Sequence, residues 1–330
     1  MTTVRIVARD NGFGLTGEIA TLRHALDELG CEVSVLSLEE AAEHERWRLG
    51  GNRLRSRLLA RWQRRQRGGQ VDMNLMFEHI WPAQLGMARK NIVLPHPEWF
   101  DNKDMRHLPW VDQVWAKTHH AIDLFAPFGR PTRFIGFDSR DRLDPSVPRE
   151  RAFFHLAGAS PLKGTLRLMH EWAANPHWPM LTVVRNKPGE RDPRAPNIRV
   201  LAGYREEAEL QHLQNAHLFH LCTSRTEGYG HYITEAMSVG AVVITVAAPP
   251  MNELVSPERG LLVTARAGDT HGLATLYDFD KPALATCVTQ AMTMGEDEIA
   301  RLGHAARAWF VQNKSGFAER LRAALAGVNA

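Results

Sequence analysis

The chain has 330 residues, of which 44% are hydrophobic and 23% charged, and its formal net charge is +3 at pH 7. These values are ordinary for a soluble protein, and the length suits two domains with a core each. No apolar run approaches the roughly 20 residues needed to span a bilayer, and the first strand begins without a signal segment. Three widely spaced cysteines suggest free thiols in a reducing compartment. A cytoplasmic protein is expected, with peripheral membrane contact still open.

The first half of the chain alternates between strand and helix patterns. Residues 4–8 predict a strand, and residues 18–29 predict a helix that ends at Gly30. Further strands are predicted at residues 33–38, 73–77, 91–94 and 113–116. Residues 133–138 are predicted to end this domain, and residues 140–149, rich in Asp, Pro and Arg, have the composition of a linker.

The second half restarts with a strand at residues 153–157 and continues strand by strand to Val263. Short parallel strands that alternate with helices predict two doubly wound α/β domains, placed at residues 1–145 and 146–330. The last helix is a candidate to pack back on the N-terminal domain. In such sheets ligands bind at the carboxyl ends of the strands.

The most informative stretch runs from Thr223 to Met237. It follows an apolar segment and precedes the β-branched residues 242–246, so it predicts a strand, a glycine-bracketed loop, a helix and a strand. Gly228 and Gly230 permit close backbone approach at the start of the helix. The N-terminus of that helix offers N–H groups and a positive dipole end to a phosphate.

Two carboxylates flank this anion site, Glu227 on the loop and Glu235 inside the helix. A carboxylate repels a phosphate, but it accepts hydrogen bonds from the hydroxyls of a sugar or a ribose. The stretch therefore points to a sugar nucleotide. The structural alternative is an ordinary turn with two solvated glutamates.

At these residues the chain resembles retaining glycosyltransferases of the GT-B fold, family 4 in particular, whose donor-site motif is Glu, seven residues, Glu. The resemblance is carried by Glu227-Gly228-Tyr229-Gly230 and Glu235-Ala236-Met237, and it continues at Glu253-Leu254-Val255 and Gly260-Leu261-Leu262-Val263. It covers most of residues 150–330 and the N-terminal half loosely. It implies two Rossmann-like domains that face each other across a cleft. The N-terminal domain would take the acceptor and the C-terminal domain the nucleotide-sugar donor.

Residues 158–164 resemble the family's phosphate-clamp loop, whose Arg and Lys hold the diphosphate. Here the loop is one residue shorter, and Ala159 stands where the arginine is expected, while Lys163 keeps the lysine position. The forked donors of an arginine are hard to replace at a phosphate. Lys163 alone, Ser160, or Arg185 at the end of the next strand could fill in, and a plain surface lysine is the structural alternative.

A literal G-x-G-x-x-G, from Gly12 to Gly17, follows the first strand. It is the fingerprint of dinucleotide-binding domains, so an NAD-dependent oxidoreductase is an alternative. The acidic residue expected about 20 residues on is poorly placed, since Glu39 lies too far along. The preferred interpretation is a loop, with Gly14, that closes on the donor; a structural tight turn is the third.

A histidine after the strand at residues 91–94 lies under the donor sugar in the family, and His96 is the best match. Pro95 and Pro97 would hold its loop in one place. His79 and the pair His119-His120 are weaker candidates, and a structural histidine is the alternative. No His/Asp/Glu cluster has metal-type spacing, and GT-B enzymes need no metal to bind the donor, so no metal or other cofactor is expected.

Residues 46–67 hold nine arginines and no acidic residue. Leu54, Leu58 and Trp62 recur at four-residue spacing, which fits a basic amphipathic helix. Three interpretations stay open: binding to an anionic membrane surface, binding to a polyanionic acceptor, or a solvated helix flank.

Taken together, the resemblance implies a retaining glycosyltransferase that uses a nucleotide sugar and no nucleic acid. The alternative is a non-catalytic nucleotide-sugar-binding protein with a degenerate site. The nucleotide base, the sugar, the acceptor and the linkage are not specified by the sequence. The predicted catalytic residues are His96, Glu227 and Lys163. The predicted donor-binding residues are Gly14, Ser160, Lys163, Glu227, Gly228, Tyr229, Gly230, His231 and Glu235.

Overall fold

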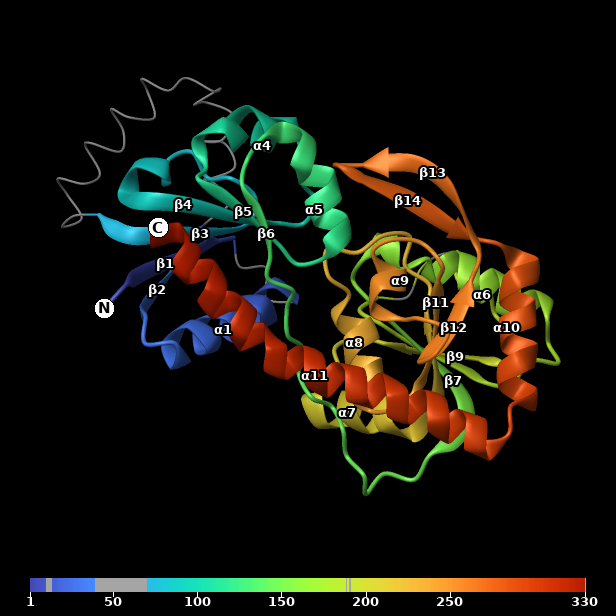
Figure 1. Ribbon diagram of the computed structural model, residues 1–330. Helices are drawn as coiled ribbons and strands as arrows, with labels where there is room; N and C mark the ends of the chain where they lie inside the picture. The colour runs from blue at the N-terminus through green and yellow to red at the C-terminus, as the bar shows by residue number, and fades with distance from the viewer. Residues whose placement is uncertain (10–13, 39–69, 188, 190, 330) are drawn as a thin grey trace. The chain divides into compact units, whose positions relative to one another are not determined.

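A computed structural model describes residues 1–9, 14–38, 70–187, 189 and 191–329 (Figure 1). The chain divides into two compact units. The first comprises Met1–Asp138, His271–Ala274 and Ser315–Ala330, and the second comprises Ser139–Thr270 and Thr275–Lys314. Helix α11 (Glu296–Asn329) thus contributes its residues from Ser315 onward to the first unit.

The first unit is built on a parallel six-stranded sheet in the order β2-β1-β3-β4-β5-β6. The chain winds outward from β1 to β2 and then returns to place β3 on the other side of β1. The topological switch point therefore lies between β1 and β3. The strands are β1 (Thr3–Ala8), β2 (Glu32–Ser37), β3 (Val71–Glu78), β4 (Ala88–Pro95), β5 (Gln113–Ala116) and β6 (Thr132–Phe134).

Among its described residues, this unit has the helices α1 (Gly14–Glu28), α4 (Asn102–His107) and α5 (His119–Phe125), besides the last part of α11. Helix α1 buries an apolar face and ends, as predicted, at Gly30, which has φ +78°. The N–H of Cys31 donates to the Leu26 carbonyl at 3.1 Å, which completes a glycine-type helix end. The first strands and α1 were predicted to within a few residues, whereas α4 and α5 were not foreseen.

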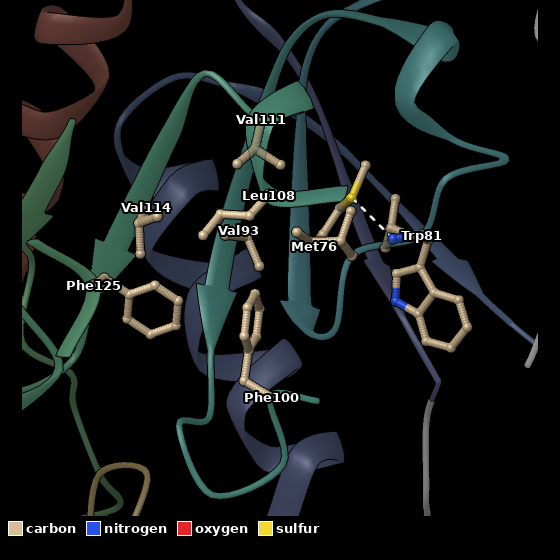
Figure 2. Close-up of a cluster of buried hydrophobic side chains, with 10 residues drawn as sticks. Met76, Trp81, Val93, Phe100, Leu108, Val111, Val114 and Phe125 are labelled. Carbon is tan, nitrogen blue, oxygen red and sulfur yellow. Dashed lines mark hydrogen bonds between the residues drawn. The ribbon is translucent and has the colours of Figure 1, made fainter. Parts of the chain in front are cut away.

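One apolar cluster of this unit gathers side chains from its sheet and from the loops and helices beside it (Figure 2). Phe100 and Phe125 meet edge to face with ring centroids 4.9 Å apart, and the backbone N–H of Trp81 donates to the Met76 sulfur at 3.4 Å. Val93 is fully buried in the same cluster. This packing fixes the segments that follow β3 and β4, where candidate site residues stand.

The second unit has its own parallel six-stranded sheet, in the order β12-β11-β10-β7-β8-β9. Its switch point lies between β7 and β10, because the chain runs outward from β7 to β9 and then returns to the other side of β7. The strands are β7 (Glu150–Gly158), β8 (Leu181–Arg185), β9 (Ile198–Ala202), β10 (His217–Cys222), β11 (Val242–Val246) and β12 (Gly260–Val263). The helices are α6 (Thr165–Ala174), α7 (Glu207–Ala216), α8 (His231–Ser238), α9 (Met251–Leu254), α10 (Lys281–Thr293) and the first part of α11. Two doubly wound sheets were predicted from the sequence, and both are present.

A two-stranded sheet follows β12, formed by β13 (Ala265–His271) and β14 (Ala274–Phe279). This hairpin was not predicted from the sequence. Its turn carries Gly272 at φ +61°. Across the described part of the chain, no helix is both long and apolar enough to cross a membrane.

Candidate active site

Two loops meet at the switch point of the second sheet. One follows β7 and holds residues 158–164; the other follows β10 and holds residues 223–230. The backbone N–H of Arg225 donates to the Leu162 carbonyl at 2.8 Å, and the Thr223 hydroxyl donates to the Lys163 carbonyl at 3.1 Å. The two predicted motifs, far apart in sequence, are therefore bonded to each other.

Gly164 makes this approach possible. It has φ +68°, and a Cβ there would collide with the Thr223 carbonyl oxygen. A side chain would have to be accommodated both in a left-handed conformation and against a backbone oxygen. The close contact between the loops therefore requires glycine at this position.

Lys163 and Glu227 form the central ion pair of the site. The Lys163 ammonium lies 2.6 Å from Glu227 Oε1 and 3.6 Å from the centroid of the Tyr232 ring. The Ser224 hydroxyl also donates to Glu227 Oε1. Both charged side chains keep a little exposure, 16% for Lys163 and 12% for Glu227. A cation and an acceptor thus lie side by side at the edge where ligands enter parallel sheets.

Gly230 caps the N-terminus of α8 with φ +106°, and a Cβ there would lie 2.8 Å from a methyl group of Leu254. Glycine is therefore required where the loop enters the helix. The ring of Tyr229 is buried, and its hydroxyl accepts a hydrogen bond from Asn313 at 2.9 Å, so this side chain packs against α11. His231 Nδ1 lies 2.7 Å from the Ser139 hydroxyl.

Glu235 has partners of its own. Gln214 Nε2 donates to Glu235 Oε2 at 3.0 Å, and Arg142 Nη2 lies 3.6 Å from Oε1. Arg142 is buried and pairs with Glu207 as well. Arg142 and Gln214 were not predicted as site residues, since neither lies in a motif.

A cavity of about 620 Å³ opens beside the loop after β7. Ala159, Ser160 and Arg185 line it together, which supports Arg185 as the residue that fills in for the absent arginine. Arg185 is paired with Asp192. Arg225 lines the same cavity and forms a two-contact ion pair with Asp278 on β14, at 3.0 and 3.1 Å. The unforeseen hairpin therefore supplies part of the wall.

In the first unit, His96 directly follows β4 and belongs to a largely buried cluster of charged side chains. Its Nε2 lies 3.1 Å from Glu18 Oε2, and its Nδ1 lies 3.6 Å from Glu78 Oε1. Lys117, fully buried, contacts both Glu18 and His96 Nε2. Its ammonium also faces the rings of Phe77 and Phe137, 5.2 and 4.8 Å from their centroids.

Burial and the Lys117 ammonium both oppose a charge on His96, but the Glu18 and Glu78 carboxylates outweigh them and raise the pKa of His96 to about 10. The sequence missed Glu18 and Lys117. A glutamate on the apolar face of a predicted helix is the one local signal that could have pointed to Glu18.

The loop after His96 is held by the turn of the hairpin. The backbone N–H of Leu273 donates to the Pro97 carbonyl at 2.8 Å, and His271 Nδ1 donates to the Glu98 carbonyl at 2.6 Å. The Trp99 and His271 rings meet edge to face at 4.8 Å. His96 therefore sits on a loop that long-range contacts, as well as prolines, hold in place.

The weaker candidates have other neighbours. His79 Nδ1 lies 2.8 Å from Asp104, and the His119 ring stacks on Phe134.

Gly14 begins α1, and a Cβ at Gly17 would meet nothing within 4 Å. In the dinucleotide fingerprint the third glycine allows close helix–strand packing, and Gly17 does not have that role here.

Among the residues that the structure describes, no group of three or more His, Cys, Asp or Glu side chains could hold a metal ion. The arginine-rich segment at residues 46–67, with its three interpretations, lies outside the described residues. All three cysteines are buried free thiols.

Comparisons with known proteins show which sequences and structures this chain resembles. Residues 196–274 match the family model of glycosyl transferases group 1. Among solved structures, the sucrose-phosphate synthase of Thermosynechococcus elongatus matches with a TM-score of 0.73 at 13% identity, covering 99% of both chains. Anabaena Alr3699/HepE, in complex with UDP and glucose, matches with a TM-score of 0.69 at 16% identity, covering 99% of this chain and 100% of that one. A glycosyltransferase from Rickettsia africae matches with a TM-score of 0.67 at 14% identity, covering 97% of this chain and 96% of that one. A search of curated proteins by sequence found no match.

The two parallel six-stranded sheets of this chain have the GT-B fold of these structures. The similarity to glycosyl transferases group 1 spans residues 196–274, which include Glu227, Glu235 and the loop after β10.

Proposed function

We propose that this protein is a glycosyltransferase that moves a sugar from a nucleoside diphosphate to an acceptor hydroxyl with retention of anomeric configuration. The observation that carries the proposal is the Lys163–Glu227 pair at the switch point of the second sheet. Lys163 would neutralise charge on the leaving diphosphate, the main electrostatic task in this chemistry. Glu227 would accept hydrogen bonds from the donor sugar, and Glu235 from the ribose.

In this reaction the bond between the anomeric carbon and the diphosphate oxygen breaks. The acceptor oxygen forms a bond to the same carbon on the same face, and the acceptor proton passes to the leaving phosphate oxygen. His96 would lie under the donor sugar. Gly14, Ser160 and the backbone from Gly228 to His231 would complete the donor site. Arg185, on the wall of the same cavity as Ala159, would take over the diphosphate contact.

A thermal-shift screen with UDP, GDP, ADP and dTDP sugars tests the donor, because a ligand that binds only the native state raises apparent stability. UDP-glucose comes first, since Alr3699/HepE was solved with UDP and glucose. The donor that binds is then offered to water and to a panel of acceptors. Product above the level of a Glu227→Ala, Lys163→Ala double variant is expected.

A non-catalytic nucleotide-sugar-binding protein is the second candidate, favoured by Ala159 and by the pairing of Arg185 with Asp192. In that case the donor raises the melting temperature, but neither hydrolysis nor transfer exceeds the double variant. NADH serves as a negative control for the oxidoreductase alternative, and no change in its fluorescence is expected.

A further inference from the structure

Glu78 lies at the carboxyl edge of the first sheet. It is the last residue of β3, beside the switch point between β1 and β3, where parallel sheets bind ligands. In the register of the sheet Glu78 is level with Pro95 of β4. Glu78 and His96 therefore lie side by side at the carboxyl edge.

The backbone of Glu78 is strained. Its φ is +63°, and among the described residues it is the only non-glycine with a positive φ. The Phe77 carbonyl accepts a hydrogen bond from the His79 N–H at 2.6 Å, so Glu78 is the centre of a tight γ-turn. A glycine would adopt this conformation without cost, yet the chain has a glutamate here. Strain of this kind is concentrated at functional sites.

The charge cluster is layered from inside to outside. Side-chain exposure rises from 0% for Lys117 and 4% for Glu18 to 13% for His96 and 22% for Glu78. The inner pair, Lys117 and Glu18, is buried, so the outer pair is the part that a ligand can reach. The contact between His96 Nδ1 and Glu78 Oε1, at 3.6 Å, is longer than a hydrogen bond.

The outer pair has the chemistry of a hydroxyl-binding site. An ionised carboxylate accepts hydrogen bonds only, and an imidazolium donates them, so the two side by side suit neighbouring hydroxyls, each of which donates and accepts. A phosphate would be repelled by Glu78. The four charges of the cluster sum to zero, so a neutral, polyhydroxylated ligand fits better than an ion.

We propose that Glu78 is a sugar-binding residue of the first unit, which together with His96 holds hydroxyl groups of a sugar substrate. The inference rests on the proposed function. The sugar is part of either the donor or the acceptor, and the two share this chemistry.

The test compares Glu78→Gln and Glu78→Gly with Glu32→Gln, which removes an exposed carboxylate from β2 of the same unit. We expect both Glu78 variants to lose turnover about tenfold or more, since a hydrogen bond to a charged group is lost. Affinity for free UDP, or for whichever free nucleotide binds, stays unchanged. The melting temperature of Glu78→Gly stays near that of the wild type, because relief of the strained φ offsets the loss of a carboxylate from the cluster. Loss of donor hydrolysis in water assigns the donor sugar, and loss confined to transfer assigns the acceptor.

The proposal is overturned if both Glu78 variants turn over as fast as Glu32→Gln. It is also overturned if Glu78→Gly loses turnover only together with a lower melting temperature, because Glu78 would then be structural. Failure of the proposed function has a different signature: the wild type itself shows no turnover with any donor of the panel.

Discussion

The ammonium of Lys163 lies 2.6 Å from the carboxylate of Glu227, although the two residues belong to different loops. Each side chain neutralises the charge of the other. A diphosphate would draw the lysine and leave the carboxylate free for sugar hydroxyls. The same pair can therefore serve both ends of the bond that breaks.

Replacing Lys163 with Ala should reduce turnover without unfolding the protein. Loss of a charge-assisted contact to the leaving group costs about 2 to 3 kcal/mol, or roughly 30- to 150-fold in rate. Steady-state kinetics with the donor found by the thermal-shift screen measures this. Lys90→Ala, which removes an exposed lysine of the first unit, is the control. Equal rates in the two variants would contradict the role of Lys163.

Substitutions of Glu227 and Glu235 should have different effects. Glu235→Ala should weaken binding of the free nucleotide, whereas Glu227→Ala should reduce turnover and leave the free nucleotide bound. Losing one charged acceptor costs about 1.5 to 3 kcal/mol. Because Glu235 also pairs with buried Arg142, Glu235→Gln is included to keep a hydrogen-bonding group there. Calorimetric titration measures the affinity for the free nucleotide. The same loss of affinity for substitutions at both positions would contradict these separate roles.

Two glycine substitutions should change the free energy of unfolding in opposite directions. Gly164→Ala puts a Cβ against the Thr223 carbonyl at a positive φ and should lower the free energy of unfolding by more than about 1 kcal/mol. Gly17→Ala, in the open surroundings of α1, should raise it by about 0.5 to 1 kcal/mol. Urea unfolding of both variants provides the values. A loss of ligand binding in Gly17→Ala would instead favour the dinucleotide interpretation.

Acid should destabilise the second unit through two buried histidines. Burial lowers the pKa of His155 to about 4 and that of His220 to about 3. Both pKa values are lowered in the folded state, so the unfolded chain binds protons first as the pH falls below about 6.5, and stability is lost from there downward. At pH 5 each histidine should cost about 2 kcal/mol relative to pH 7.

His155 offers the clearer variant for this prediction. Its Nδ1–H donates to the Leu221 carbonyl at 2.7 Å, so its Nε2 accepts from the Thr165 hydroxyl at 2.9 Å, which only the neutral ring can do. Urea unfolding of His155→Gln at pH 7 and pH 5 should show a smaller difference than the wild type. The same difference in both proteins would rule out His155 as a source of the acid sensitivity.

The arginine-rich segment at residues 46–67 is predicted to bind an anionic surface, with a membrane preferred over a soluble polyanion. Nine like charges repel one another unless something anionic receives them, and each basic residue near an anionic bilayer contributes about 1 kcal/mol. Liposome co-sedimentation with anionic and neutral lipids, at low and high salt, measures this. If Arg61, Arg64, Arg65 and Arg67 changed together to Gln leave sedimentation and activity unaltered, the segment is a solvated flank.

The amino-acid sequence was enough to predict the alternation of strands and helices, the two parallel sheets and the resemblance to a glycosyltransferase motif. These depend on local patterns: β-branched runs, helix ends such as Gly30, and a motif whose members lie within 15 residues of one another. The hairpin of β13 and β14 was not predicted because β13 is polar and mostly exposed, without the apolar run that marked the other strands.

Only the tertiary structure decided which charges meet. Glu18, Glu78, His96 and Lys117 come from four separate segments, and parallel strand order brings the last residues of neighbouring strands to one edge of the sheet. Arg142 and Gln214 likewise reach Glu235 from outside its helix. A buried charge is tolerated only beside its counter-charge. That pairing is made between segments distant in the chain, so no local pattern records it.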